Sequence, residues 1–373
     1  MSQRLKIERV EAILVDIPTI RTHHLAFANV NVQNHVIVRI HADGLTGTGE
    51  ASTVGGPAWG DESVEGIKTV IDRYLVQALV GEDANELARL NARMEMFVKG
   101  NPFAKAAVET ALHDLVARAR GLPMHALLGG KVRDAIPVAW TLAAGETGRD
   151  IEEAQEMLRL KRHNMFKLKV GARDPQQDYD HVAAICKAVG DRASIRLDVN
   201  QAWDPLTAAR WLPRLGDAGV DLVEQPIPRW NLPALRRLRG GKIAVMADES
   251  LGTPQDAFAL AREAAVDVFS LKLTKHGGIA GTLKVAAVGE AAGIALYGGA
   301  MLETGIGTAT QVHTYGVLGN LTAGCECFGP LILKDTITRE KMVFEDFTVK
   351  VPDGPGHGMT LDEDKLARYR RPA

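Results

Sequence analysis

Cysteines and long apolar runs are scarce in this sequence. Three cysteines (Cys186, Cys325 and Cys327) are too few and too unevenly placed for a disulfide framework, which indicates a reducing compartment. The C-x-C of Cys325 and Cys327 has no second cysteine pair or histidine pair, which argues against a zinc site. No run approaches the roughly 20 apolar residues of a membrane span. The first 18 residues lack the apolar core and cleavage site of a signal peptide. A soluble, cytoplasmic protein with no membrane contact is expected.

An excess of charge of one sign is also missing. The chain has 44 Lys and Arg against 46 Asp and Glu, a formal net charge of -2, and no basic block stands out. Nucleic-acid binding needs a basic footprint, so no nucleic-acid partner is expected. The 373 residues could hold two ordinary domains, or one large barrel with an accessory domain.

The first third of the chain has a mixed α+β pattern. Its β-rich runs are 9–18, 35–42 and 43–52, and its stretches with helical spacing are 61–80, 84–99 and 103–120. This pattern predicts an α+β capping domain over residues 1–130. The tail, 345–373, loses the rhythm of the central region and is expected to pack back on that domain.

Short apolar strands alternate with helices from residue 131 to 344. The predicted strands are 136–142, 165–170, 193–199, 220–225, 243–248, 266–273, 294–299 and 323–329. Eight strands with helices between them favour an α/β fold, a modified (β/α)8-type barrel, over an open sheet.

Three acids each end a predicted strand. Asp198 and Glu224 are 26 residues apart, and Asp248 follows after a further 24. A carboxylate at the tip of an apolar strand is costly unless it is paired, solvated or bound to metal. A single strand-end acid often caps a helix, but three on consecutive strands predict a metal site. Ligands that are all oxygen favour Mg²⁺ or Mn²⁺ over zinc.

Three lysines accompany these acids. Lys167 and Lys169 are two residues apart, so their side chains point to one side of the strand that precedes Asp198. Lys272 ends the strand that follows Asp248. A partly desolvated lysine beside another cation can act as a general base. Metal and cations that stabilise a dianion, with lysines moving protons at an α-carbon, form the pattern of enolase-superfamily sites.

The ordered motifs resemble one subgroup of that superfamily. K-x-K at 167–169, D-V-N at 198–200, E-Q-P at 224–226, A-D-E-S at 247–250 and K-L at 272–273 are similar to the muconate lactonizing subgroup. The likeness runs over most of the chain and is strongest to the muconate and chloromuconate cycloisomerases. It implies interconversion of cis,cis-muconate and muconolactone, with Mn²⁺ or Mg²⁺, in aromatic catabolism. The resemblance also implies a homo-oligomer, such as an octamer.

The same resemblance assigns residue roles. Lys169 protonates the enolate, Lys167 supports it, Lys272 adds positive charge on the opposite face, and Glu326 lies beside the small dicarboxylate substrate. Val54, Trp59, Asn200 and Phe328 are the predicted substrate contacts. Two loops of the capping domain, 20–29 and 52–60, are expected to set specificity, and whether His23 or His24 touches substrate stays open.

Several alternatives remain at this point. Val54, Pro57 and Trp59 resemble the chloromuconate version of their loop, whereas Phe328 and KHGG at 275–278 resemble the muconate version, so we favour muconate. C-E-C at 325–327 differs from the D-x-D of dipeptide epimerases, which argues against that activity. Lys272 stands in place of the His–Asp pair of mandelate-racemase-like enzymes, which argues against those. Two alternatives from other classes are a Schiff-base lyase without metal and an inactive barrel kept for binding.

Overall fold

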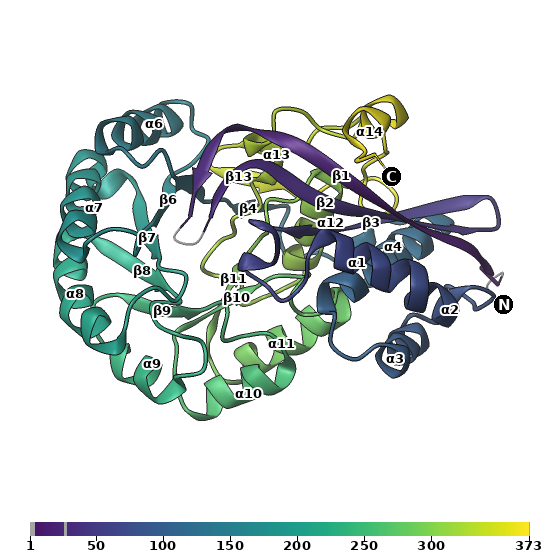
Figure 1. Ribbon diagram of the computed structural model, residues 1–373, viewed down its shortest axis with the longest axis horizontal. Coiled ribbons are helices and arrows are strands. Elements are labelled where there is room, and N and C mark those ends of the chain that lie inside the picture. The colour runs from purple at the N-terminus through teal and green to yellow at the C-terminus, as the bar shows by residue number, and fades with distance from the viewer. Residues whose placement is uncertain (1–3, 26–27, 373) are drawn as a thin grey trace.

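A three-stranded antiparallel sheet opens the chain. The computed structural model describes residues 4–25 and 28–372, and its first strands are β1 (Ile7–His24), β2 (Asn29–Ala42) and β3 (Leu45–Thr53). Asp43 and Gly44 both have positive φ (47° and 75°) and form the two-residue turn between β2 and β3. The far end of the β1–β2 hairpin reaches across to the barrel (Figure 1), where Arg21 donates to the Thr141 carbonyl.

Helices cover one face of this sheet. They are α1 (Val64–Val70), which continues through a π-helical turn (Ile71–Leu75) into α2 (Val76–Leu79), then α3 (Leu87–Phe97), α4 (Pro102–Ala119) and α5 (Met124–Leu127). Helix α4 packs closely on β3. A Cβ on Gly47 or Gly49 would lie only 2.3 or 2.2 Å from a carbonyl oxygen of α4, so these glycines allow the approach.

A curled parallel sheet forms the second part. Its strands, in spatial as well as chain order, are β5 (Trp140–Leu142), β6 (Met165–Lys169), β7 (Ser194–Asp198), β8 (Val220–Glu224), β9 (Ala244–Ala247), β10 (Val268–Leu271) and β11 (Ala295–Gly298). Each strand is followed by one helix, in order α6 (Thr147–Arg159), α7 (Pro175–Val189), α8 (Pro205–Ala218), α9 (Leu232–Leu238), α10 (Pro254–Arg262), α11 (Ile279–Ala291) and α12 (Gly305–Gly316). They ring the strands in Figure 1, which confirms the predicted barrel with an N-terminal cap.

The last predicted strand differs from the expectation. Segment 323–329 forms no regular strand; Cys325 alone bridges Gly298 on one side and Val138 on the other. Gly324 has positive φ (76°), and the short helix α13 starts at Gly329, which leaves little extended backbone for a ladder. The ring is therefore closed by single bridges.

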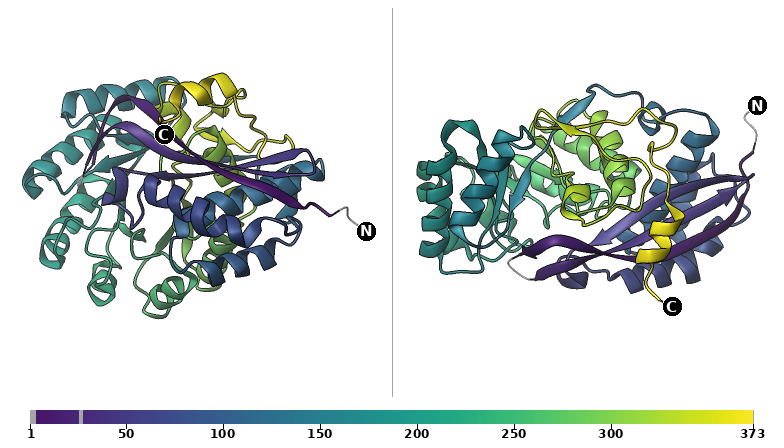
Figure 2. Two further views of the ribbon diagram at one scale, coloured as in Figure 1. Left: turned by 45° about the vertical axis from the view of Figure 1, so that its right-hand side comes forward. Right: turned by 90° about the horizontal axis from the view of Figure 1, so that it is seen from above.

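The first predicted barrel strand is divided in two. Residues Ala135–Pro137 form β4, which pairs with β13 (Thr348–Lys350) of the tail, while β5 begins the parallel sheet. The tail also contains β12 (Phe344–Glu345) and α14 (Glu363–Tyr369). Helix α14 crosses the N-terminal sheet in Figure 2, and Arg371 after it pairs with Asp16 of β1. The tail thus contacts both the barrel and the N-terminal sheet.

The interior contains two large apolar clusters and three free cysteines. One cluster follows the barrel and a second fills the space between the N-terminal sheet and its helices. All three cysteines are free, as their number and placement predict, and all three are buried. Among the described residues, no helix is long and apolar enough to cross a bilayer.

Candidate active site at the mouth of the barrel

A cavity lies where the carboxyl ends of the barrel strands meet the N-terminal sheet. Eight of the eleven predicted site residues line it: Val54, Trp59, Lys169, Asp198, Asn200, Lys272, Glu326 and Phe328. The other three, Lys167, Glu224 and Asp248, lie buried behind this wall. The strand ends carry these groups because parallel strands of a barrel end on one face.

Lys167 is held by carboxylates in the barrel interior. It lies in the middle of β6 and donates to Glu224 Oε2 at 2.5 Å, and it forms a further ion pair with Glu326. Burial opposes its charge, but Glu224 and Glu326 raise the pKa of Lys167 well above its usual value. Lys167 therefore stays protonated and fixes both acids.

Lys169, at the end of β6, reaches the cavity. Its Nζ lies 2.5 Å from Asp198 Oδ2 and 3.2 Å from Asn200 Oδ1. Asn200 has positive φ (45°), which Asn tolerates better than most residues, and its amide nitrogen donates to Glu249 Oε1 at 3.2 Å. Asn200 thereby orients Lys169 through its carbonyl oxygen.

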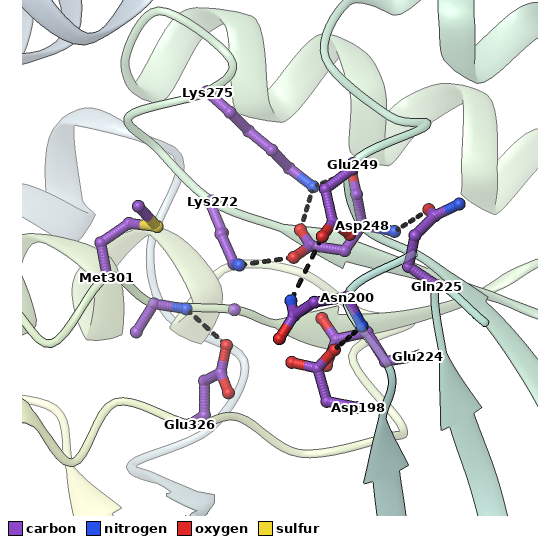
Figure 3. A network of polar contacts seen from close by, with 12 residues as sticks. Asp198, Asn200, Glu224, Gln225, Asp248, Glu249, Lys272, Lys275, Met301 and Glu326 are labelled. Atoms are coloured by element: carbon purple, nitrogen blue, oxygen red, sulfur yellow. Dashed lines mark hydrogen bonds and ion pairs between the residues drawn. The ribbon is translucent and has the colours of Figure 1, made fainter. Parts of the chain in front are cut away.

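Asp248 is paired with two lysines, as Figure 3 shows. Lys272 Nζ lies 2.6 Å from its Oδ2, and Lys275 Nζ lies 2.7 Å from its Oδ1. Burial disfavours the charge on Lys272, but Asp248 and Glu326 raise its pKa above the usual range. Lys272 is consequently a fixed positive charge on the opposite side of the cavity from Lys169.

Two acids of the site resist ionisation. Burial, and then the charges of Asp198 and Asp248, raise the pKa of Glu224 to about 8 against the opposing effect of Lys167. Burial and the neighbouring Asp248 raise the pKa of Glu249 to about 7. Glu224 Oε1 and Glu249 Oε2 are buried and accept no hydrogen bond from the described part of the chain.

The predicted metal ligands are paired with lysines in this arrangement. Within residues 4–25 and 28–372, no three His, Cys, Asp or Glu side chains surround one point closely enough to bind a metal as they stand. Asp198, Glu224 and Asp248 nevertheless follow one another on β7, β8 and the end of β9, where β8 pairs with both neighbours.

Apolar side chains from the N-terminal part and from the barrel line the cavity. Trp59 places its ring 4.1 Å below Lys272 Nζ, and Phe328 packs against Trp140 with 5.0 Å between ring centroids. His23 also lines the cavity, and its Nδ1 has no partner among the described residues. His24 is exposed and bonded to Asn29. Residues 26 and 27 of the predicted loop lie outside the described residues.

Some site residues were not predicted from the sequence. Glu249 follows Asp248 directly in A-D-E-S at 247–250, and Lys275 begins K-H-G-G at 275–278, but the sequence pattern assigns no role to either. Their position beside Asp248 could not be seen in sequence spacing. Leu302, which also lines the cavity, has a positive φ of 59°, and the local sequence does not predict this conformation.

Comparisons with known proteins agree with this geometry. Residues 9–129 match the mandelate racemase / muconate lactonizing enzyme N-terminal domain, and residues 149–365 match the enolase C-terminal domain-like family. A chloromuconate cycloisomerase of Cupriavidus necator is 53% identical, covering 99% of this chain and 100% of the relative. Muconate cycloisomerase 1 of Pseudomonas putida is 50% identical, covering 98% of both.

Solved structures show the same likeness. The muconate lactonizing enzyme of Pseudomonas fluorescens, crystallised with muconolactone, superposes with a TM-score of 0.98 at 50% identity and covers 99% of this chain and 100% of that one. The 2-chloromuconate cycloisomerase of Rhodococcus opacus 1CP gives 0.96 at 41% identity, covering 98% and 100%. The chain therefore belongs to the mandelate racemase and muconate lactonizing enzyme family of the enolase superfamily, on its muconate and chloromuconate cycloisomerase branch.

Proposed function

We propose that this enzyme interconverts cis,cis-muconate and muconolactone in the catabolism of aromatic compounds. The observation that carries the proposal is the pair of lysines, Lys169 and Lys272, which face one cavity from separate strands of the barrel. Fixed cations stabilise the negative charge that develops when a carboxylate substrate becomes an enolate. The muconolactone bound to a 50% identical structural neighbour fits the same chemistry.

The two lysines divide the work. In the lactonizing direction, one substrate carboxylate adds to the conjugated diene, and an enolate forms on the other. Lys169, held by Asp198 and Asn200, delivers a proton to the α-carbon and removes it in reverse. Lys272, whose proton is retained by Asp248, provides charge rather than proton transfer.

Lys167 and Glu326 support this arrangement. Lys167 pairs with both Glu224 and Glu326 and so holds the two acids in place. Glu326 Oε1 accepts from the Ala300 amide at 3.0 Å, which ties it to the loop after β11. Its carboxylate lines the cavity and would lie beside the substrate.

Asp198, Glu224 and Asp248 are the proposed ligands of a divalent metal, Mn²⁺ with Mg²⁺ as the alternative. The donor set is entirely oxygen, and Glu224 Oε1 is buried without a partner in the described part of the chain. Burial, and then repulsion from Asp198 and Asp248, raise the pKa of Glu224. A divalent ion bound there would supply positive charge for the enolate, as in related sites.

Chloromuconate is the second candidate substrate. The 53% identity to a chloromuconate cycloisomerase and the Val54 and Trp59 wall favour it, whereas Phe328, which fills space beside Glu326, favours muconate. Because an apolar pocket separates groups of methyl size by only about 1–3 kcal/mol, we propose muconate turnover with tolerance for chlorinated analogues.

The same proposal includes the wider organisation of the protein. Residues 1–130 would act as the capping domain, with the tail 345–373 packed against it, and 131–344 as the catalytic barrel. The cytoplasm suits three free buried thiols. Leu206, Trp230 and Phe258 are large, exposed apolar side chains near α8, α9 and α10, and they suit a homo-oligomer such as an octamer.

An absorbance assay of muconate loss tests the proposed activity. Purified protein with Mn²⁺ should consume muconate, and product analysis should give muconolactone. Absence of turnover with both muconate and its chlorinated analogues would contradict the proposal. Borohydride added with substrate should leave no reduced adduct; a stable lysine adduct would favour a Schiff-base lyase instead.

A further inference from the structure

A glutamate of the N-terminal helical layer caps a barrel helix. Helix α11 begins after Gly278, which has no side chain to cap it. Glu109 of α4 takes that place: its Oε2 accepts from the Ile279 amide at 2.8 Å and its Oε1 from the Ala280 amide at 3.0 Å. A Cβ on Gly278 would lie 2.5 Å from Glu109 Oε2, so the carboxylate fills the space that a capping side chain would need.

Helix α4 is joined at its own start to the loop that carries Trp59. Glu62, three residues after Trp59, accepts from the Phe103 and Ala104 amides at 2.7 and 3.2 Å. The Trp59 and Phe103 rings also approach each other, with 6.4 Å between centroids. One helix therefore connects the loop that carries Trp59 to the start of α11.

The segment before α11 begins at Lys272. It is tightly wound, since the Gly278 amide donates to the Leu273 carbonyl at 2.8 Å and the His276 amide to the Lys272 carbonyl at 3.2 Å. A movement of the start of α11 would thus be passed to Lys272. Lys272 and Trp59 meet directly across the cavity, at 4.1 Å.

Glu109 is charged in this environment. Burial disfavours the ionised form, but His113 and the Ile279 and Ala280 amides hold the pKa of Glu109 below its ordinary value. A carboxylate at a helix start is also favoured by the helix dipole. The contact is thus strong and geometrically fixed, because two amides are bound by the two oxygens of one group.

We propose that Glu109 is a positioning residue that sets Lys272 over Trp59 by fixing the start of α11 against α4. This inference rests on the proposed function, in which Lys272 supplies charge to the enolate. Glu109 does not line the cavity and acts only through the segment that carries Lys272. A misplacement of about 1 Å at a catalytic group can cost 100-fold in rate.

Kinetics of four variants test the proposal. Glu109→Gln removes the charge and one acceptor oxygen. Glu109→Asp keeps the charge, but its side chain is too short to reach both amides, and Gly278→Ala adds a Cβ that displaces the Glu109 carboxylate. Each of these three variants should lower kcat for muconate at least 10-fold and leave KM within about twofold. Asp204→Ala, which removes an exposed cap from α8, is the matched control and should keep the wild-type kcat.

A spectroscopic measurement separates positioning from a general loss of stability. The ε-protons of Lys272 lie near the Trp59 ring, so their NMR signal in ¹³C-lysine-labelled protein, assigned with Lys272→Arg, should be shifted upfield. The shift should diminish in the Glu109 and Gly278 variants and persist in Asp204→Ala.

Unchanged kcat and an unchanged Lys272 signal in Glu109→Gln and Gly278→Ala would overturn the inference. If one of them fails to fold, the other still changes the same contact. A wild-type enzyme without muconate turnover would instead contradict the proposed function, while the Lys272 signal would continue to report on the contact.

Discussion

Glu303 should make the stability of the protein depend on pH. It lies between β11 and α12, directly after the cavity-lining Met301 and Leu302. Its Oε2 accepts from the Met301 amide and its Oε1 from Gln311 Nε2, both at 2.7 Å. Burial, and then the nearby carboxylate of Glu50, raise the pKa of Glu303 to about 8.

The sign of the effect follows from this raised pKa. In the unfolded chain Glu303 should titrate near its ordinary value of 4.5, so the native state holds a proton that the unfolded state releases between pH 4.5 and 8. The contribution of this group to stability is full below about pH 4.5 and is lost as the pH rises through 8. At 1.36 kcal/mol per pKa unit, the full loss is about 5 kcal/mol. Because buried sites behave as if their dielectric constant were near 20, we expect the actual loss of stability to be about half of this value.

Glu303→Gln removes the titration and keeps the shape. The side-chain amide nitrogen of the new glutamine must face one of the two donors, the Met301 amide or Gln311 Nε2. This costs stability by an amount that does not change with pH. The free energy of unfolding of the variant, relative to the wild type, should therefore rise by roughly 2 kcal/mol between pH 5 and pH 9.

Urea unfolding followed by circular dichroism at pH 5, 7 and 9 is the assay. Glu345→Gln, at an exposed position on β12, is the control and should follow the wild type at every pH. A difference between Glu303→Gln and the wild type that stays constant with pH would refute the reasoning. So would a difference that grows in favour of the wild type.

Two further predictions concern metal and substrate. Exhaustive chelation should abolish muconate turnover and Mn²⁺ should restore it, and Asp198→Asn, Glu224→Gln and Asp248→Asn should each weaken Mn²⁺ binding at least 10-fold, by calorimetry, in folded protein. Full activity after chelation, or unchanged affinity in all three variants, would exclude the proposed metal site. Phe328→Ile should move the ratio of kcat/KM towards chloromuconate by up to about 100-fold, because room opens beside Glu326. An unchanged ratio would show that Phe328 does not select the substrate.

The fold was largely predictable because its signals are local and periodic. Apolar strands with a charged end recur every 24 to 26 residues, and this rhythm alone indicates β7 to β10 and their helices. The closure of the ring was not predictable, since segment 323–329 has the composition of a strand but only Cys325 makes bridges. Bridging of this kind depends on tertiary neighbours that sequence pattern does not encode.

The candidate site could be predicted only in part. Residues at strand ends must converge, so Lys169, Asp198 and Lys272 were found by position. The roles of Glu249 and Lys275 depend on burial and on distances of about 3 Å, which spacing cannot give. Contacts between the N-terminal helices and the barrel, such as that of Glu109, join residues 170 positions apart and leave no periodic trace.

Exchange of the α-proton of muconolactone with solvent tests the division of labour between the two lysines most directly. The measurement is proton NMR of muconolactone in D₂O with Mn²⁺ and the wild type, Lys169→Ala or Lys272→Ala. Loss of a general acid–base group costs about 10²- to 10⁴-fold, so Lys169→Ala should abolish detectable exchange. Lys272→Ala should slow exchange but leave it detectable, because Lys169 still reaches the α-carbon. Exchange that persists at the wild-type rate in Lys169→Ala and disappears in Lys272→Ala would contradict the account.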